Sequence, residues 1–161
     1  MRPMTTVAQL LLQLDQAYDH QSWHGTNLRG SLRRVTLEQA AWRPAPNRHN
    51  IWEIAVHAAY WKYAVGRRLS GEPRGSFPVK GSNWFRRPDE HTGRAWKADL
   101  SLLGSEHARL RRAVESLVPA ALHRTPAGGR ATYLNLVAGI IAHDLYHAGQ
   151  IQLLKRLAPK P

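Results

Sequence analysis

The strongest chemical signal in the sequence is a pair of histidines, His143 and His147. Residues at this spacing lie on one face of a helix about one turn apart, so both imidazoles can reach the same ion. Both fall on the apolar face of a predicted helix. Buried imidazoles at this spacing indicate a metal site, and the alternative is a pair of core histidines that hydrogen-bond to their neighbours.

His57 is the best candidate for a third ligand. A metal ion needs at least one more protein ligand, and in a helical bundle this comes from the inward face of a neighbouring helix. His57 lies midway along another predicted helix, where the small side chains of Ala55 and Ala58 leave space beside it. We therefore predict that one divalent ion is held by His57, His143 and His147.

Two further histidines, His24 and His107, also fall on inward faces of predicted helices. Either could line the pocket or supply a fourth ligand. We favour packing and hydrogen bonding for both, because a catalytic site keeps one coordination position open. Four other histidines are expected to lie off the apolar faces or in solvated loops: His20, His49, His91 and His123.

Acidic residues accompany two of the candidate ligands. Glu53 lies one turn before His57 and could be a ligand or general base, although a capping box with Asn50 already explains it. Asp144 stands where the HExxH motif places its catalytic Glu, but Asp is shorter and the third ligand lies elsewhere, which disfavours a metalloprotease. Two alternatives remain equal for Asp144: it is either a hydrogen-bond partner of a metal-bound imidazole or an exposed residue of the helix.

Four further residues are candidates for the lining of the pocket: Trp52, Trp61, Trp84 and Gln150.

Four amphipathic stretches must position these residues. Apolar residues recur every three or four positions over about 6–34, 50–70, 93–117 and 132–157. Gly25 and Asn27 bend or break the first, whereas Asn50 and Thr132 are the expected N-caps of the second and fourth. These stretches predict an all-α, four-helix bundle in a single domain spanning 1–161.

The segment 71–92 separates the second and third predicted helices and is rich in glycine and proline. It also contains Phe77, Trp84 and Phe85, which are too apolar to stay in water. We therefore expect a long ordered loop of the kind that often covers a site.

Composition narrows the chemistry further. The sequence contains no Cys, which excludes a Cys-ligated zinc site and a thiolate nucleophile from this chain. Its formal net charge of +12 favours contact with phosphates, yet no basic tail or nucleic-acid motif is present, so we do not expect specific nucleic-acid binding. With no signal peptide or membrane span recognised, we expect a soluble, cytoplasmic protein with no membrane partner.

The histidine pattern resembles that of the DinB/YfiT-like superfamily of four-helix-bundle metalloproteins. The hallmark of that family is one His on the second helix and an H-x3-H pair on the last, which here are His57, His143 and His147. Residues 148–151 are similar to the family's H-x-G-Q-I ending, and residues 50–57 resemble the lead-in to its first ligand. Residues 23–25 resemble the opening of one branch. The resemblance implies a metal site, usually zinc or nickel, often within a homodimer.

The superfamily that the sequence resembles includes thiol-dependent transferases and isomerases, hydrolases and proteins known only as damage-inducible. Our first hypothesis is a metal-dependent enzyme acting on a small-molecule substrate, in which the ion activates water for hydrolysis or a thiol for transfer. Because the chain has no Cys, that thiol would be a low-molecular-weight cofactor. The second hypothesis is a stress-associated binding protein whose metal is structural, and the third is a basic nucleic-acid-associated protein.

Overall fold

The computed structural model describes residues 4–75 and 77–159, and within these residues every regular element is helical. An isolated bridge between Ser82 and Trp84 is the one pairing of extended backbone recorded in this part of the chain. The predicted all-α class is therefore confirmed. No helix in the described residues is long and apolar enough to cross a membrane.

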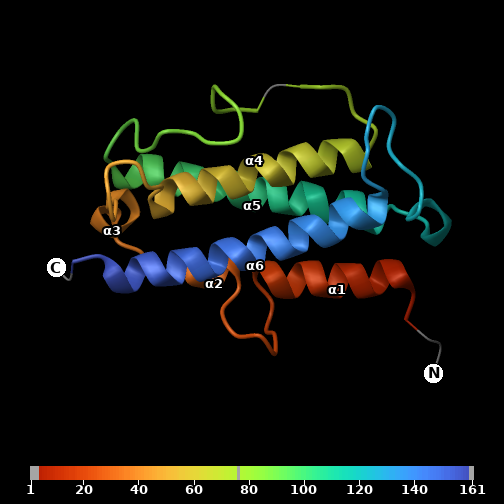
Figure 1. The fold of residues 1–161 in the computed structure, drawn as a ribbon, viewed down its shortest axis with the longest axis horizontal. Coiled ribbons are helices and arrows are strands. Elements are labelled where there is room, and N and C mark those ends of the chain that lie inside the picture. The colour runs from red at the N-terminus through yellow and green to blue at the C-terminus, as the bar shows by residue number, and fades with distance from the viewer. Residues whose placement is uncertain (1–3, 76, 160–161) are drawn as a thin grey trace.

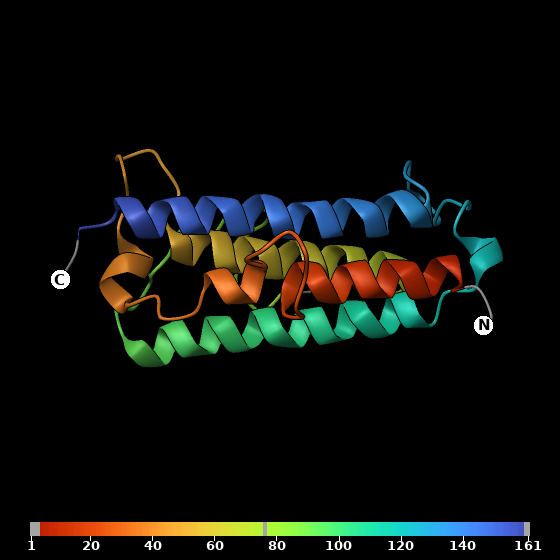
Figure 2. The ribbon, with the colours of Figure 1, turned by 90° about the horizontal axis from the view of Figure 1, so that it is seen from below.

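Four long helices run side by side (Figures 1 and 2): α1 (Thr6–Tyr18), α4 (Ile51–Leu69), α5 (Gly93–Glu115) and α6 (Tyr133–Leu157). Both α1 and α4 pack against α5 and α6, so the four enclose a common core. Apolar side chains fill this core in two clusters, one around Leu14 and Leu110 and the other around Trp52 and Ile151. Gly66 allows a close approach of α4 to α5, because a Cβ there would lie 3.4 Å from the Cα of Leu110.

The three later helices begin and end close to their predicted limits. Asn50 and Thr132 are the N-caps of α4 and α6, and their side chains accept hydrogen bonds from the backbone amides of Glu53 and Asn135. Capping side chains of this kind satisfy amides that have no partner within the helix. Two short elements were not predicted: α3 (Leu37–Ala41) and the 3₁₀ helix η1 (Pro119–Ala121).

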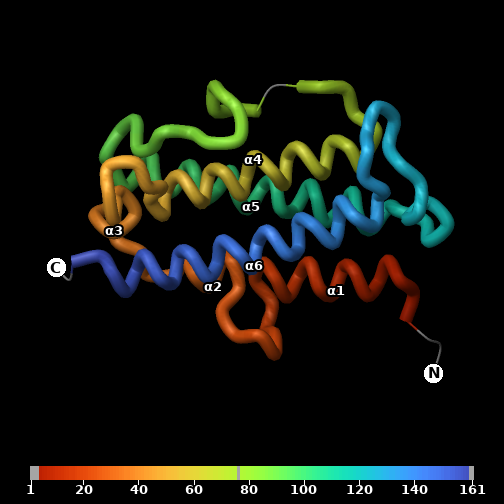
Figure 3. Tube along the Cα trace, in the orientation of Figure 1, coloured from red at the N-terminus to blue at the C-terminus, as the bar shows by residue number. Residues whose placement is uncertain are grey.

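The first predicted helix is wrong in its extent. It ends at Tyr18, and the chain leaves the helical path until α2 (Leu28–Ser31), which packs against α6. Asn27 starts α2 because its side chain accepts a hydrogen bond from the amide of Gly30, and Gly25, with a φ of +94°, lies in the loop between the two helices. The predicted break is therefore present, but it begins already at Asp19. The tube in Figure 3 follows this loop away from the bundle and back.

A buried ion pair joins α4 to α6. Lys62 on α4 donates to Asp144 on α6, and both side chains are 0% exposed. Burial lowers the pKa of Lys62 and raises the pKa of Asp144, and their mutual attraction opposes both changes. The expected alternatives for Asp144 are therefore corrected: it is neither exposed nor bonded to an imidazole, because Lys62 occupies its Oδ2.

We predict that Asp144→Asn lowers the free energy of unfolding of the metal-free protein by about 3–5 kcal/mol, because it leaves the Lys62 ammonium buried without a counter-charge. The double variant Lys62→Met/Asp144→Leu removes both charges and should stay within about 2 kcal/mol of the wild type. Urea unfolding followed by circular dichroism measures both values. A double variant that loses as much stability as Asp144→Asn, or more, would show that the two charges do not act as a pair.

Candidate metal centre

The three predicted ligands meet between α4 and α6. His57, His143 and His147 each offer a ring nitrogen, and these atoms lie within 4.8 Å of one another. The Nε2 atom of His143 is 3.1 Å from Nε2 of His57 and 3.1 Å from Nε2 of His147. Two nitrogens bound tetrahedrally to one zinc ion at about 2.0–2.1 Å lie roughly 3.3 Å apart. The two measured separations are close to this value, so the cluster is compatible with three ligands on one ion.

Hydrogen bonds on the far side of two rings fix their tautomers. Nδ1 of His57 donates to the backbone carbonyl of Asn83 at 2.7 Å, and Nδ1 of His147 donates to Oε1 of Gln150 at 2.7 Å. Both neutral rings thus present an Nε2 lone pair toward His143, which has one Nε2 proton at most to share between them. A cation bound at this point would remove the remaining repulsion between lone pairs, so the donor set suits a metal ion.

The three clustered histidines are neutral at physiological pH. Burial lowers the pKa of His143 to about 3, with a further contribution from His147 and His57. Burial also lowers the pKa of His147 to about 4, against the hydrogen bond to Gln150, and it lowers the pKa of His57. Neutral imidazole is the form that binds metal ions, so protons do not compete with a metal near pH 7.

The loop between α4 and α5 covers His57. The ring of Trp84 stacks on His57 with centroids 3.8 Å apart. Asn83 accepts from His57 through its backbone carbonyl and from Nε1 of Trp61 through its side chain at 2.9 Å. Asn83 adopts a φ of +63°, a left-handed conformation that Asn tolerates better than most residues. The predicted cover is therefore present, and it also orients His57.

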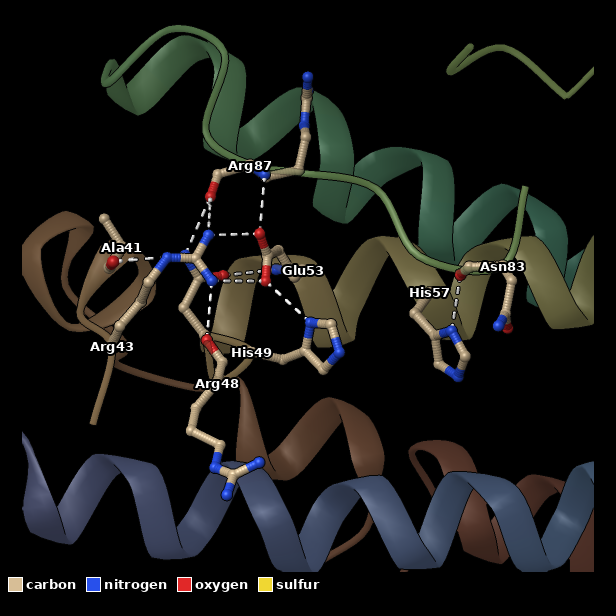
Figure 4. A network of polar contacts seen from close by, with 9 residues as sticks. Ala41, Arg43, Arg48, His49, Glu53, His57, Asn83 and Arg87 are labelled. Atoms are coloured by element: carbon tan, nitrogen blue, oxygen red, sulfur yellow. Dashed lines mark hydrogen bonds and ion pairs between the residues drawn. The ribbon is translucent and has the colours of Figure 1, made fainter. Parts of the chain in front are cut away.

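A polar network at the start of α4 anchors the far end of this loop (Figure 4). Glu53 accepts hydrogen bonds from the guanidinium of Arg43, from Nδ1 of His49 and from the backbone amide of Arg87. Asn50 donates to the Arg87 carbonyl at 2.9 Å. Burial alone would raise the pKa of Glu53, but the hydrogen bonds from Arg43 and His49 hold it below its usual value.

One half of the expected capping box is present, because Asn50 accepts a hydrogen bond from the Glu53 amide. The Glu53 carboxylate binds the guanidinium of Arg43 instead of the Asn50 amide, and it is not part of the three-histidine cluster. Its partner His49 is exposed, as expected, but its ring also stacks on Trp84 with centroids 3.6 Å apart, and Trp84 stacks in turn on His57. His49 is the site residue that the sequence analysis missed. The i, i+4 spacing of His49 and Glu53 was the available signal, because it allows the contact across the helix start.

The other candidates lie outside the cluster. His24 is exposed in the loop between α1 and α2, so its expected inward position is wrong. His107 is buried as expected but stacks on Tyr18 with centroids 3.7 Å apart, on the α1 side of the bundle. Trp52 is a core residue rather than a pocket residue, and its Nε1 donates to Asp99 at 2.6 Å.

A comparison with sequence models of protein families matches residues 20–151 to the DinB superfamily. Comparisons with curated proteins and with solved structures find no match. The matched range contains the three clustered histidines and Gln150, together with the loop that covers His57.

We predict that the metal-free protein loses stability as the pH falls below about 6.5, the pKa of an unfolded histidine. Burial lowers the pKa of His107 to about 2 in the folded state, so the unfolded chain takes up the proton first. The contribution of His107 is complete above pH 6.5 and declines toward pH 2, by about 1.4 kcal/mol per pH unit. Urea unfolding between pH 7 and pH 5 should show a shallower pH dependence in His107→Phe. Equal slopes in both proteins would contradict the assignment.

Proposed function

The chain belongs to the DinB superfamily, and on this basis we propose that it is a metal-dependent enzyme whose His57, His143 and His147 hold one divalent ion, zinc or nickel. The convergence of three Nε2 atoms on one point carries the proposal. Imidazole nitrogen suits either metal.

A cluster of three histidines favours a catalytic ion over a structural one, because it would leave a coordination position open. Structural zinc sites are closed by four protein ligands, whereas catalytic sites keep a position for water or substrate. The cluster in the described residues contains three side chains, and neither His24 nor His107 joins it. His143 is partly exposed, so the site can be reached from solvent.

An ion bound here would lower the pKa of a water molecule or a small thiol and so supply a nucleophile at neutral pH. Asn83 and Gln150 hold the rings of His57 and His147 in the tautomer that points Nε2 into the site. Trp84 shields His57 from water by stacking on its face. The reaction is hydrolysis when water is activated and transfer to an electrophile when the thiol of a low-molecular-weight cofactor is activated.

We predict that the wild-type protein binds about one zinc or nickel ion per chain, and that His57→Ala and His143→Ala each abolish tight binding, since two imidazoles alone rarely retain an ion. Isothermal titration calorimetry and elemental analysis measure the binding. The matched control is His123→Ala, an exposed histidine outside the cluster. Gln150→Ala keeps all three ligands but should weaken binding about 10–100-fold, because His147 loses its orienting bond. Full metal content in either ligand variant would refute the site.

Activity separates the catalytic proposal from metal binding alone. The metal-loaded protein is assayed with an activated ester, and with a small thiol plus an electrophilic aryl halide, beside the His143→Ala variant. We expect the wild type to accelerate at least one of these reactions. A metal that raises the melting temperature but accelerates neither reaction would favour a structural role.

We also propose that the chain forms a homodimer through the outer face of α6. Exposed residues there follow a three- and four-residue spacing, and none of the positions in this set is charged: Gly139, Ala142, Tyr146, Gly149 and Leu153. Tyr146 is 64% exposed and Leu153 is 58% exposed. A continuous uncharged stripe on a helix is typical of a surface that a second helix covers.

Sedimentation velocity tests the dimer. We predict that the wild type sediments with a mass of twice the 18.2 kDa of one chain. The variant Ala142→Asp/Leu153→Asp should sediment as a monomer, because the introduced charges would be buried at the interface. The control Leu12→Asp places a charge on an exposed apolar position of α1 and should leave the dimer intact. A monomeric wild type at about 100 μM would exclude a stable dimer.

A further inference from the structure

A cavity of about 740 Å³ lies next to the histidine cluster, between the C-terminal half of α4, the loop that follows it and the segment that precedes α6. Figure 3 shows that last segment rising beside the end of α4. Trp61 lies between the cavity and the histidine cluster and contacts both. It lines the cavity, and its ring centroid is 6.4 Å from those of His57 and His143.

Four arginines from these three segments line the cavity: Arg67, Arg68, Arg74 and Arg130. The lining contains no carboxylate, and the ion pairs of the described residues involve none of the four. Arg67 donates to the backbone carbonyl of Glu72, which leaves its charge uncompensated. Guanidinium groups gathered around a concave surface attract anions and match carboxylate and phosphate oxygens in pairs.

A buried hydroxyl in the same wall provides a second, independent indication of a ligand. Tyr63 lines the cavity, is 8% exposed, and its hydroxyl has no hydrogen-bond partner among the described residues. A buried hydroxyl without a partner costs about 1–3 kcal/mol, so such groups are normally satisfied. The oxygen atom itself is enclosed, and Gly75 of the cavity wall lies beside it. A ligand oxygen would therefore accept this hydrogen bond after a small movement of the wall at Gly75, while the arginines neutralise the charge of the ligand.

We propose that this cavity binds the carboxylate or phosphate group of a small ligand. Arg67 follows His57 by ten residues on α4, which at 1.5 Å per residue places them about 15 Å apart along the helix. A ligand with its anionic end among the arginines can therefore extend past Trp61 toward the three histidines. That this ligand is the substrate or the thiol cofactor of the metal site rests on the proposed function, whereas the anion site stands on the cavity alone.

Calorimetric titration of the metal-free protein with inorganic pyrophosphate and, separately, with citrate tests the proposal at about 0.15 M ionic strength, where long-range attraction is screened. Removal of the metal prevents it from capturing either probe. We expect one anion per chain for at least one probe, and the probe that binds distinguishes phosphate from carboxylate recognition. Arg68→Ala/Arg130→Ala should weaken binding at least about tenfold, and Tyr63→Phe should weaken it about three- to tenfold.

The matched control is Arg94→Ala/Arg156→Ala, which removes the same charge from exposed positions outside the cavity and should change the dissociation constant less than about twofold. Equal weakening in the two double variants would mean that only the net charge attracts the probe, and it would overturn the proposal, as would no binding of either probe. The His143→Ala variant should bind the anion as the wild type does. If the wild-type protein binds the anion but fails to bind metal, the proposed function is rejected while this anion site remains.

Discussion

The buried ion pair between Lys62 and Asp144 sets how α4 and α6 lie against each other, and the three-histidine cluster depends on that alignment. Both charges are fully buried, so a shift of one helix along the other would leave each without a partner in an apolar interior. Asp144 directly follows His143, and Lys62 lies five residues after His57. The contact therefore holds α4 and α6 in the register that brings His57 opposite His143 and His147.

The loop after α4 fixes the orientation of His57 within this alignment. Hydrogen bonds from Arg87 to Glu53 and from Asn50 to Arg87 attach the end of the loop to the start of α4. With that end attached, Asn83 and Trp84 lie over His57, one fixing its tautomer and the other covering its face. The polar network at the helix start thus orients the histidine cluster without belonging to it, and the same loop forms one wall of the arginine-lined cavity.

Several roles could not be assigned because they depend on partners remote in sequence. The approximate limits of α4, α5 and α6 were predictable, since capping residues and apolar periodicity are local signals. Periodicity failed at His24, because it continues through a stretch where Asn27 begins a new helix. The local pattern placed Glu53 correctly on the helix, but it could not identify the partners of its carboxylate. These partners are Arg43 and Arg87, which lie ten and thirty-four residues away along the chain.

The sequence by itself determined the helical class and the inward positions of the three clustered histidines. One-turn spacing and an apolar face are properties of a single helix, so they can be recognised without tertiary contacts. Only the tertiary structure decided how close their Nε2 atoms lie, which hydrogen bonds fix their tautomers, and that Asp144 pairs with a lysine instead of an imidazole. It also decided that four arginines from three segments surround one cavity. These features require helices and loops distant in sequence to come together, and their geometry is set by packing and by the need to satisfy buried charges.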